Sequence, residues 1–305
     1  MPRIFTLTAN LLAETTYIYD TWTEGATQRA TTEFFQVGGK GINVTRLLTR
    51  LGAESVALYF PGGSTGERCA GWLRKHGVPT EPFVTPHETR SGAVVRAPGR
   101  AETTFLGTDN VIDPRAILAC ARFLDAQPAG TVLAVCGSIP DWQNKAWKPL
   151  GDAIARLSAR GSLTVDTYGP PLAELVSMSA TLVKINRKEF SGLAGVPQVE
   201  LTDARMAELL PTIARASTVP RWVVTDGPDA VWVCETGSPA VSVTPPPIHE
   251  VSPTGSGDVL HAGILHALFE HGEPLEAAVR FALPLAAANA ASAGVADFDL
   301  TPFGF

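Results

Sequence analysis

Short apolar runs alternate with amphipathic segments along most of the chain. The apolar runs are rich in Val, Leu and Ile, which is typical of buried strands, and they lie at residues 3–8, 55–60, 131–137, 163–168, 180–186 and 221–227. Helical periodicity predicts helices at residues 41–52, 66–77, 114–127, 145–161, 170–179, 203–217 and 259–272. This alternation predicts an α/β fold in which helices cover both faces of a mainly parallel sheet.

Two segments break the alternation, at about residues 14–36 and 89–107. Both are rich in Thr, Tyr, Phe and Val, and in places both alternate polar with apolar residues. We expect antiparallel strands that form a small projecting sheet, because such strands do not easily extend a parallel one. The small sheet is either a lid over a binding site or an ordinary edge hairpin. Residues 1–305 would then form a single domain with a discontinuous lid.

Composition and charge exclude several classes of protein. The 305 residues are 45% hydrophobic, which is enough to bury a full core. A net charge of −6 without a cluster of Lys or Arg argues against nucleic acid as a partner. The cysteines are far apart and include no C-x-x-C pair, which argues against a disulfide framework or a zinc site. No apolar run approaches the roughly 20 residues that span a bilayer, so we expect a cytoplasmic protein without a membrane partner.

The stretch TGSGD, residues 254–258, places glycines and an acid directly before a helical pattern. A helix N-terminus exposes unpaired backbone N–H groups, and glycines let the backbone approach an anion closely. The stretch therefore predicts a phosphate site at Gly255, Ser256 and Gly257. It lacks the G-K-[ST] of a Walker loop, and no G-x-G-x-x-G follows the first strand. The alternative is that Asp258 merely caps the helix.

A second glycine-rich stretch, GGKGINV at residues 38–44, opens the first amphipathic helix. It predicts either a plain glycine turn or a turn that places Asn43 to hydrogen-bond the hydroxyls of a polyol. Together, GGKGINV and TGSGD resemble the two signature regions of the ribokinase/PfkB family of carbohydrate kinases. GGKGINV resembles the 1-phosphofructokinase and tagatose-6-phosphate kinase branch. The resemblance spans nearly the whole chain and implies a ribokinase-like three-layer α/β/α core with a small β-sheet lid.

The resemblance implies ATP as the phosphoryl donor, together with Mg2+ and a candidate monovalent cation such as K+. Asp258 would be the general base, and the amides of Gly255, Ser256 and Gly257 would form an anion hole for the transferring phosphoryl group. The residues implied on the nucleotide side are Lys184, Asn186, Thr225, Gly227, Gly255, Gly257 and Asn289. Asn186 and Glu189, from the stretch KINRKEF, would also hold the magnesium.

The acceptor side resembles the phosphosugar branch less completely. The implied substrate contacts are Glu14, Arg29, Gly38, Gly39, Lys40, Asn43, Arg90 and Ser138. Glu14 stands where the branch usually has an aspartate that binds sugar hydroxyls. Arg29 and Arg90 match basic positions for the phosphate already on the substrate, and a guanidinium group can bind phosphate bidentately. These residues predict an acceptor such as fructose 1-phosphate, fructose 6-phosphate or tagatose 6-phosphate.

The sequence is compatible with two other functions. Glu14, Ala230 and the stretch FLGTDN, residues 105–110, depart from the family pattern, as they would in a catalytically idle sugar or nucleotide sensor. A kinase of an unphosphorylated sugar or nucleoside would not need Arg29 and Arg90 to face the acceptor pocket. In dimeric members of the family that this chain resembles, the lids pack together, and the aromatic residues of the first lid segment suggest the same homodimer here.

Several other polar residues receive a structural interpretation. His261, His266 and His271 are five residues apart, a spacing that does not stack side chains on one helical face. We therefore expect surface or core histidines rather than a metal site. Asp166 and Asp226 end predicted strands on the side where α/β proteins bind ligands, but acids at strand ends are also common turn residues. Neither is included in the predicted site.

Overall fold

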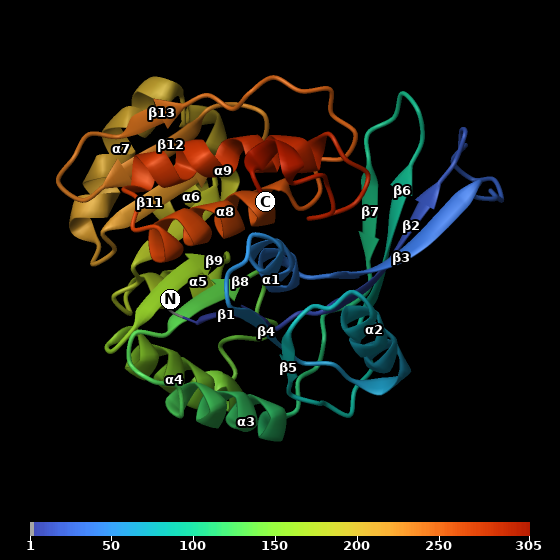
Figure 1. Ribbon diagram of the computed structural model, residues 1–305, viewed down its shortest axis with the longest axis horizontal. Helices are drawn as coiled ribbons and strands as arrows, with labels where there is room; N and C mark the ends of the chain where they lie inside the picture. The colour runs from blue at the N-terminus through green and yellow to red at the C-terminus, as the bar shows by residue number, and fades with distance from the viewer. Residues whose placement is uncertain (1–2) are drawn as a thin grey trace.

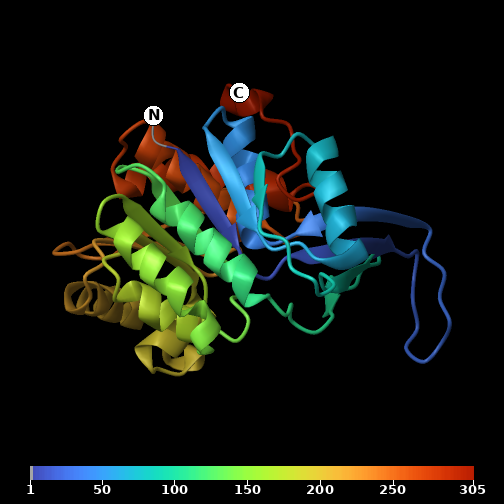
Figure 2. The same cartoon turned by 90° about the horizontal axis from the view of Figure 1, so that it is seen from below.

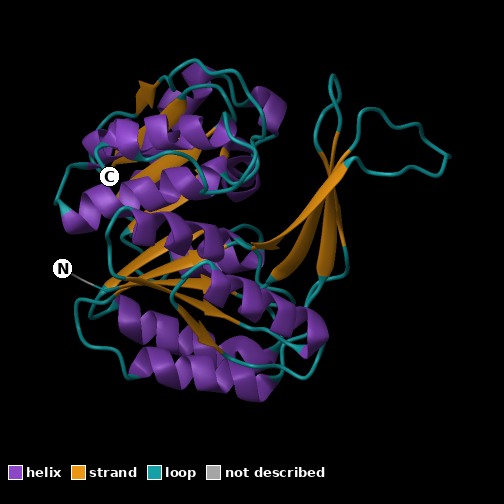
Figure 3. Cartoon of the chain, turned by 45° about the vertical axis from the view of Figure 1, so that its right-hand side comes forward, coloured by secondary structure: helices purple, strands orange, loops and turns teal. Residues whose placement is uncertain are grey.

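The structure is a computed structural model that describes residues 3–305. Within this range, nine α-helices and a large sheet form a three-layer core, and a second, smaller sheet projects from one end (Figures 1 and 3). No helix of the described range is long and apolar enough to cross a membrane.

The core sheet contains nine strands. They are β1 (Ile4–Thr8), β4 (Ser55–Tyr59), β5 (Thr80–Pro82), β8 (Val132–Cys136), β9 (Ser162–Asp166), β10 (Leu182–Asn186), β11 (Arg221–Thr225), β12 (Val231–Glu235) and β13 (Val241–Val243), in the spatial order β13-β12-β11-β10-β9-β8-β1-β4-β5. Pairing is parallel from β5 to β11, and β12 and β13 extend the sheet in antiparallel fashion. The six predicted strands are confirmed. β5, β12 and β13 were not predicted; β5 and β13 have only three residues each, which is too short to show a period.

Nine helices cover the two faces of the core sheet (Figures 1 and 2). One face carries α1 (Lys40–Arg50), α2 (Gly63–Lys75), α8 (Ser256–Glu270) and α9 (Leu275–Ala290), and the other carries α3 (Pro114–Asp125), α4 (Lys148–Ser158), α5 (Pro170–Val176), α6 (Arg187–Ala194) and α7 (Asp203–Ala216). The seven predicted helices are confirmed. Two further helices, α6, which is short, and α9, were not predicted.

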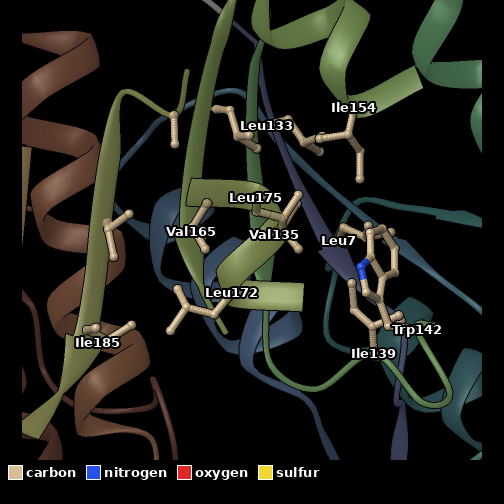
Figure 4. Packing of buried hydrophobic residues seen from close by; sticks show 14 of the residues in the cluster. Leu7, Leu133, Val135, Ile139, Trp142, Ile154, Val165, Leu172, Leu175 and Ile185 are labelled. Atoms are coloured by element: carbon tan, nitrogen blue, oxygen red, sulfur yellow. The ribbon is translucent and has the colours of Figure 1, made fainter. Parts of the chain in front are cut away.

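Side chains from alternate positions of each strand pack into separate clusters on the two faces. In β1, Phe5 and Leu7 pack with the cluster of α3 and α4, whereas Ile4 packs with the cluster of α1, α8 and α9. Figure 4 shows part of the first cluster, with side chains of neighbouring strands directed at the helices that cover them. Burial on both faces fixes the strands in register, so their carboxyl ends meet at one edge of the sheet.

The second sheet, called the small sheet below, has the strand order β3-β2-β6-β7. Its strands are β2 (Leu12–Ile18), β3 (Thr32–Gly38), β6 (Ser91–Arg96) and β7 (Thr103–Leu106). Each predicted segment contributes two strands, as expected. The expectation of an all-antiparallel sheet is wrong at its centre, where β2 and β6 pair in parallel. They run in the same direction because both leave the core outward, and β3 and β7 return to it (Figures 1 and 2).

Candidate active site

Two hollows lie on either side of the N-terminus of α8, at the carboxyl ends of the parallel strands, where α/β proteins bind ligands. The first, called the inner cavity, has a volume of about 240 Å3 and faces the small sheet; its lining includes Thr8, Asn10, Glu14, Gln36, Gly38, Gly39, Lys40, Asn43, Arg90, Cys136, Ser138, Tyr168, Gly255 and Asp258. The second, called the outer groove, has a volume of about 600 Å3 and faces α9; its lining includes Thr225, Gly227, Val231, Ile248, Ser256, Gly257, Leu260 and Leu283. All predicted acceptor residues except Arg29 line the inner cavity. Of the residues predicted on the nucleotide side, Thr225, Gly227 and Gly257 line the outer groove, and the two hollows share one helix end.

The turn into α8 has the shape of an anion site. Gly255 adopts a left-handed backbone with φ of 77°, and a Cβ there would lie 2.2 Å from Cγ1 of Val295, so the turn requires glycine. Among the residues that the structure describes, no protein atom accepts the N–H groups of Gly255 and Gly257. The N–H of Ser256, in contrast, donates to the carbonyl of Pro253 at 3.2 Å. Two of the three predicted amides are thus available to an anion at the positive end of the helix.

The carboxylate of Asp258 lies in the first turn of α8, where the inner cavity meets the anion turn. Its Oδ2 accepts a hydrogen bond from Nδ2 of Asn43 at 2.8 Å, so the side chain predicted to bind polyol hydroxyls also orients this acid. Burial raises the pKa of Asp258 to about 6, the nearby charge of Asp166 adds to the rise, and Lys40 opposes it. The ionised form of Asp258 is therefore less favoured than that of an exposed aspartate.

Asp166, which the sequence analysis left out, organises the charges beneath the anion turn. It is fully buried at the end of β9, where Oδ1 accepts from Nζ of Lys40 at 2.6 Å and Oδ2 from Nζ of Lys184 at 2.8 Å. Burial opposes ionisation, but the two ammonium groups hold the pKa of Asp166 well below its usual range. A Cβ on Gly257 would lie 3.0 Å from Nζ of Lys184, so this charge sits directly against the anion turn.

His261 lies one turn after Asp258 and borders the same charges. Its Nδ1 is 3.7 Å from Oδ2 of Asp166, and its Nε2 is 3.4 Å from Oγ1 of Thr164. Burial lowers the pKa of His261 to about 4, so the imidazole is neutral at pH 7. The interpretation as a core histidine is confirmed for His261. His266 and His271 contact each other at the far end of α8 instead, with their Nε2 atoms 3.1 Å apart.

The wall of the inner cavity between β2 and α1 combines a buried acid with a glycine turn. Glu14 is buried and accepts a hydrogen bond from the side-chain amide of Gln36. Burial raises its pKa. Gly39 has φ of 136°, and a Cβ there would lie 2.6 Å from Cγ2 of Thr8, which explains why the turn before Lys40 is built from glycine. The backbone of this turn is therefore close to anything bound beside Glu14.

The opposite wall carries Arg90 in a hydrogen-bonded network. Its guanidinium donates to Oδ1 of Asp109 at 3.1 Å and to the carbonyl of Asn10 at 3.2 Å. The side-chain amide of Asn10 donates to Asp109 at 2.7 Å and to Oγ of Ser138 at 2.9 Å. Asp109 lies in the stretch that departs from the family pattern, and the sequence analysis assigned it no role. The contacts of the Asp109 carboxylate with Arg90 and Asn10 join residues far apart in the sequence, so only the folded structure shows them.

Arg29 does not reach the inner cavity of its own chain. It lies on the loop between β2 and β3, where it lines a shallow hollow with Tyr17, Tyr19, Gln28 and Glu33. The structure therefore brings one of the two predicted phosphate-binding arginines, Arg90, into the inner cavity and leaves the other on the small sheet.

The outer groove combines apolar residues with a few polar ones. Thr225 ends β11 and Gly227 follows it, and both line the groove together with Ser256 and Gly257 of the anion turn. Asn289 does not line the groove; it is buried behind the turn, where its amide donates to the carbonyl of Thr254 and to Oγ of Ser256, both at 3.0 Å. The structure thus gives Asn289 a supporting position rather than a contact with a ligand.

Asn186 and Glu189 cap the N-terminus of α6. Oδ1 of Asn186 accepts the N–H of Glu189 at 2.8 Å, and Oε2 of Glu189 accepts the N–H of Asn186 at 2.8 Å. Oε1 of Glu189 lies 3.6 Å from Nζ of Lys40, on the side of the charged cluster. Mg2+ prefers carboxylate oxygens and retains several waters, so this donor set fits the ion through one carboxylate oxygen and water molecules.

Comparisons with known proteins agree with this geometry. A family model described as pfkB family carbohydrate kinase matches residues 10–301. ATP-dependent 6-phosphofructokinase isozyme 2 of Escherichia coli strain K12 is 29% identical over 301 residues, which cover 96% of this chain and 93% of the relative. The 1-phosphofructokinase of Borreliella burgdorferi is 26% identical over 296 residues, which cover 97% of this chain and 94% of the relative.

Solved structures share the architecture. Phosphofructokinase-2 from Escherichia coli in complex with substrates and products has a TM-score of 0.86 at 25% identity, covering 94% of this chain and 93% of the other. Ribokinase from Giardia lamblia has a TM-score of 0.79 at 14% identity over 97% of this chain and 96% of the other, a likeness of fold alone. The predicted ribokinase-like α/β fold is confirmed.

Proposed function

The chain belongs to the pfkB family of carbohydrate kinases, and from this membership we propose that it transfers the γ-phosphoryl group of ATP to a hydroxyl group of a sugar phosphate. The observation that carries the proposal is the position of Asp258. It lies at the one helix end that borders both hollows, beside two free amides and the ammonium group of Lys184. Phosphoryl transfer needs this combination, because it depends on positioning and charge neutralisation more than on covalent chemistry.

In the proposed reaction, the acceptor hydroxyl lies in the inner cavity against Asp258. The carboxylate accepts the hydroxyl proton as the oxygen attacks phosphorus, and Asn43 keeps the carboxylate oriented. The N–H groups of Gly255 and Gly257 and the charge of Lys184 stabilise the phosphoryl oxygens. A pKa of about 6 leaves most of Asp258 ionised at pH 7, so the base is ready without a preceding deprotonation.

ATP would lie in the outer groove, with its phosphates directed at the anion turn. The apolar side chains of Val231, Ile248, Leu260 and Leu283 offer a surface for the base. Bound Mg2+ would neutralise charge on the phosphates, and Glu189 is the residue that would hold it through water. We also retain a monovalent cation such as K+ as a candidate cofactor; a solved phosphofructokinase-2 neighbour is a complex with potassium.

The proposal of a phosphorylated acceptor is supported by Arg90, whose side chain lines the inner cavity. Arg29 gives no such support within one chain. The runner-up functions therefore become outcomes of the experiment below: a kinase of an unphosphorylated sugar or nucleoside, and a sensor without activity.

We further propose that residues 1–305 act as one kinase domain in which the small sheet is the lid. Closure of this lid would exclude water and limit hydrolysis of ATP. Phe105 and Leu106 on the small sheet are 59% and 55% exposed, which supports a homodimer in which two such sheets cover each other. Sedimentation of a monomer at micromolar concentration would count against the dimer. A cytoplasmic location is part of the same proposal.

The deciding experiment measures ADP release with Mg2+ and ATP across fructose 1-phosphate, fructose 6-phosphate, tagatose 6-phosphate, fructose, ribose and nucleosides. Turnover confined to phosphosugars is the expected result. Turnover with neutral acceptors alone would replace the proposal with the first runner-up, and silence with intact ATP binding would favour the sensor.

The variant Asp258→Asn belongs in the same assay, because loss of a general base costs on the order of 100-fold to 10,000-fold in rate. The amide is isosteric and leaves the anion turn in place, so ATP binding should persist. Turnover equal to that of the unaltered protein would reject Asp258 as the base.

A further inference from the structure

A network of charged and polar side chains joins the small sheet to the anion turn. Arg96 ends β6, and Glu102 lies just before β7, so both belong to the outer hairpin of the small sheet. Their side chains pair at 2.6 Å between Nε and Oε2, and each is only 12% exposed. A pair this well shielded from water, with further hydrogen bonds, differs from an ordinary surface salt bridge.

Every nitrogen of the Arg96 guanidinium has a partner, and two of the partners flank the anion turn. NH2 donates to Oγ of Ser252 at 2.8 Å, and NH1 donates to the carbonyl of Ala293 at 2.8 Å. Ser252 precedes Gly255 by three residues, and Ala293 precedes Val295, whose side chain packs against Gly255. The guanidinium therefore bridges the two segments between which the anion turn is held.

Glu102 reaches the turn from the same side. Its Oε2 accepts the hydroxyl of Ser252 at 2.9 Å, and its Oε1 accepts the hydroxyl of Thr254. Thr254 is the residue directly before Gly255, and its carbonyl is bound from the other side by Asn289. A displacement of the outer hairpin would remove two acceptors from the residues that lead into the turn, because both carboxylate oxygens are engaged there.

We propose that Arg96 and Glu102 are positioning residues through which the small sheet sets the geometry of the anion turn. The sheet that covers the acceptor side thereby controls the groups that bind the phosphoryl group on the donor side. The turn attains its binding geometry only while the outer hairpin is seated on residues 252–254 and 293. This inference rests on the proposed function for its kinetic test and on the structure alone for its second test.

The kinetic test compares Arg96→Ala with Arg100→Ala. Arg100 lies on the same hairpin, where its guanidinium is 4.8 Å from the ring of Trp22, and it is exposed at the tip. We expect kcat to fall by about 10-fold to 100-fold in Arg96→Ala, because a small displacement of a positioning group has effects of this order. The KM values of both substrates should change much less, and Arg100→Ala should retain its kcat.

Chemical rescue separates positioning from a general loss of structure. Added guanidinium ion should restore part of the kcat of Arg96→Ala, whereas urea, which has a similar shape and no charge, should not. Glu102→Gln keeps the size of the side chain and should lower kcat in the same direction. If guanidinium and urea act alike, or if Arg96→Ala keeps its kcat, the proposal is wrong.

Hydrogen exchange provides a test that needs no turnover. Amides of residues 251–258 should exchange faster in Arg96→Ala than in the unaltered protein, and Arg100→Ala should match the unaltered protein. Equal exchange in all three proteins would overturn the proposal even if kcat had fallen. A silent enzyme whose exchange responds as expected would reject the proposed function and leave this inference standing.

Discussion

The inner cavity and the outer groove share the anion turn and differ in almost everything else. The inner cavity is about 240 Å3 in volume, and its charged side chains are each tied to another polar group, as Glu14 is to Gln36 and Arg90 to Asp109. The outer groove is about 600 Å3, and Glu250 is the only charged side chain among its described lining residues. Under the proposed function, fixed charges would select the acceptor, whereas shape, apolar surface and the helix end would hold the donor.

This difference determines how each region responds to substitution. Removing one member of a buried charged network leaves its partners without compensation, which costs far more than the lost contact itself. Removing an apolar side chain from an open groove costs only the area that it covered. Substitutions should therefore have large effects around the inner cavity and small effects in the outer groove.

The largest effect is expected from Asp166→Asn, which leaves Lys40 and Lys184 without their buried counter-ion. The free energy of unfolding should fall by about 3–5 kcal/mol, the usual cost of breaking a buried ion pair from one side. Urea unfolding followed by circular dichroism measures it. Asp152→Asn, which breaks the exposed pair with Lys148, is the matched control and should cost at most about 1 kcal/mol. Equal unfolding midpoints for the two variants would contradict the central position of Asp166.

The next effect concerns the acceptor phosphate. Arg90→Met should raise the KM for a sugar phosphate by about 10-fold to 100-fold, because a hydrogen bond to a charged group contributes about 1.5–3 kcal/mol. The KM for ATP should stay unchanged, since Arg90 lies in the inner cavity. Arg115→Met, on the exposed start of α3, is the control. Initial rates at varied acceptor concentration decide the matter, and an unchanged KM would place the phosphate elsewhere.

A third prediction concerns pH. Because Asp258 must be ionised and its pKa is raised to about 6, kcat should decline as the pH falls through 6 and should be fully present well above it. Below that value, the decline should approach about tenfold per pH unit. Asn43→Ala removes a hydrogen bond that favours the carboxylate, so the acid limb should move to higher pH. A profile of kcat that is flat from about pH 5 to pH 7 would exclude Asp258 as the titrating base.

The smallest effect is expected in the outer groove. Ile248→Ala shortens a lining side chain that is already 42% exposed, so the KM for ATP should rise only a few-fold, in line with a loss of about 1 kcal/mol or less. Val199→Ala, at a position 90% exposed and far from the groove, controls for a general effect. A rise of about 100-fold would show that the groove depends on specific contacts as strongly as the inner cavity does.

The comparison of the two hollows also shows what the sequence could predict. Local signals sufficed for six strands of the core sheet, for the two segments of the small sheet and for the turns at residues 38–40 and 255–257, because periodicity and glycine spacing are local properties. The parallel pairing of β2 with β6 joins segments more than 70 residues apart, and no local pattern encodes it. α9 was not predicted, and its interior Pro284 does not account for this, because α7 contains Pro211 and was predicted.

The site residues also divide into those that local sequence could predict and those that it could not. Those that belong to a glycine-rich stretch were predicted at the site and lie at it, as with Asp258 and Lys40. Asp166 and Asp109 were missed because their importance comes from partners elsewhere in the chain, and an acid at a strand end resembles a turn residue. Asn289 illustrates the converse: the sequence placed it near the nucleotide, and the structure places it behind the turn.

The contact between Asn43 and Asp258 spans 215 residues, and its consequence concerns the order of assembly. Arg46 and Arg50 of α1 likewise donate to the carbonyls of Val295 and Ala296, near the end of the chain. Contacts of such long range are slow to form, because the chain loses the entropy of the open loop before the contacts can stabilise the fold. During synthesis, the contacts of α1 with α8 and with residues 295 and 296 can therefore form only after residues 256–296 have emerged, although α1 can already pack on β1 and β4.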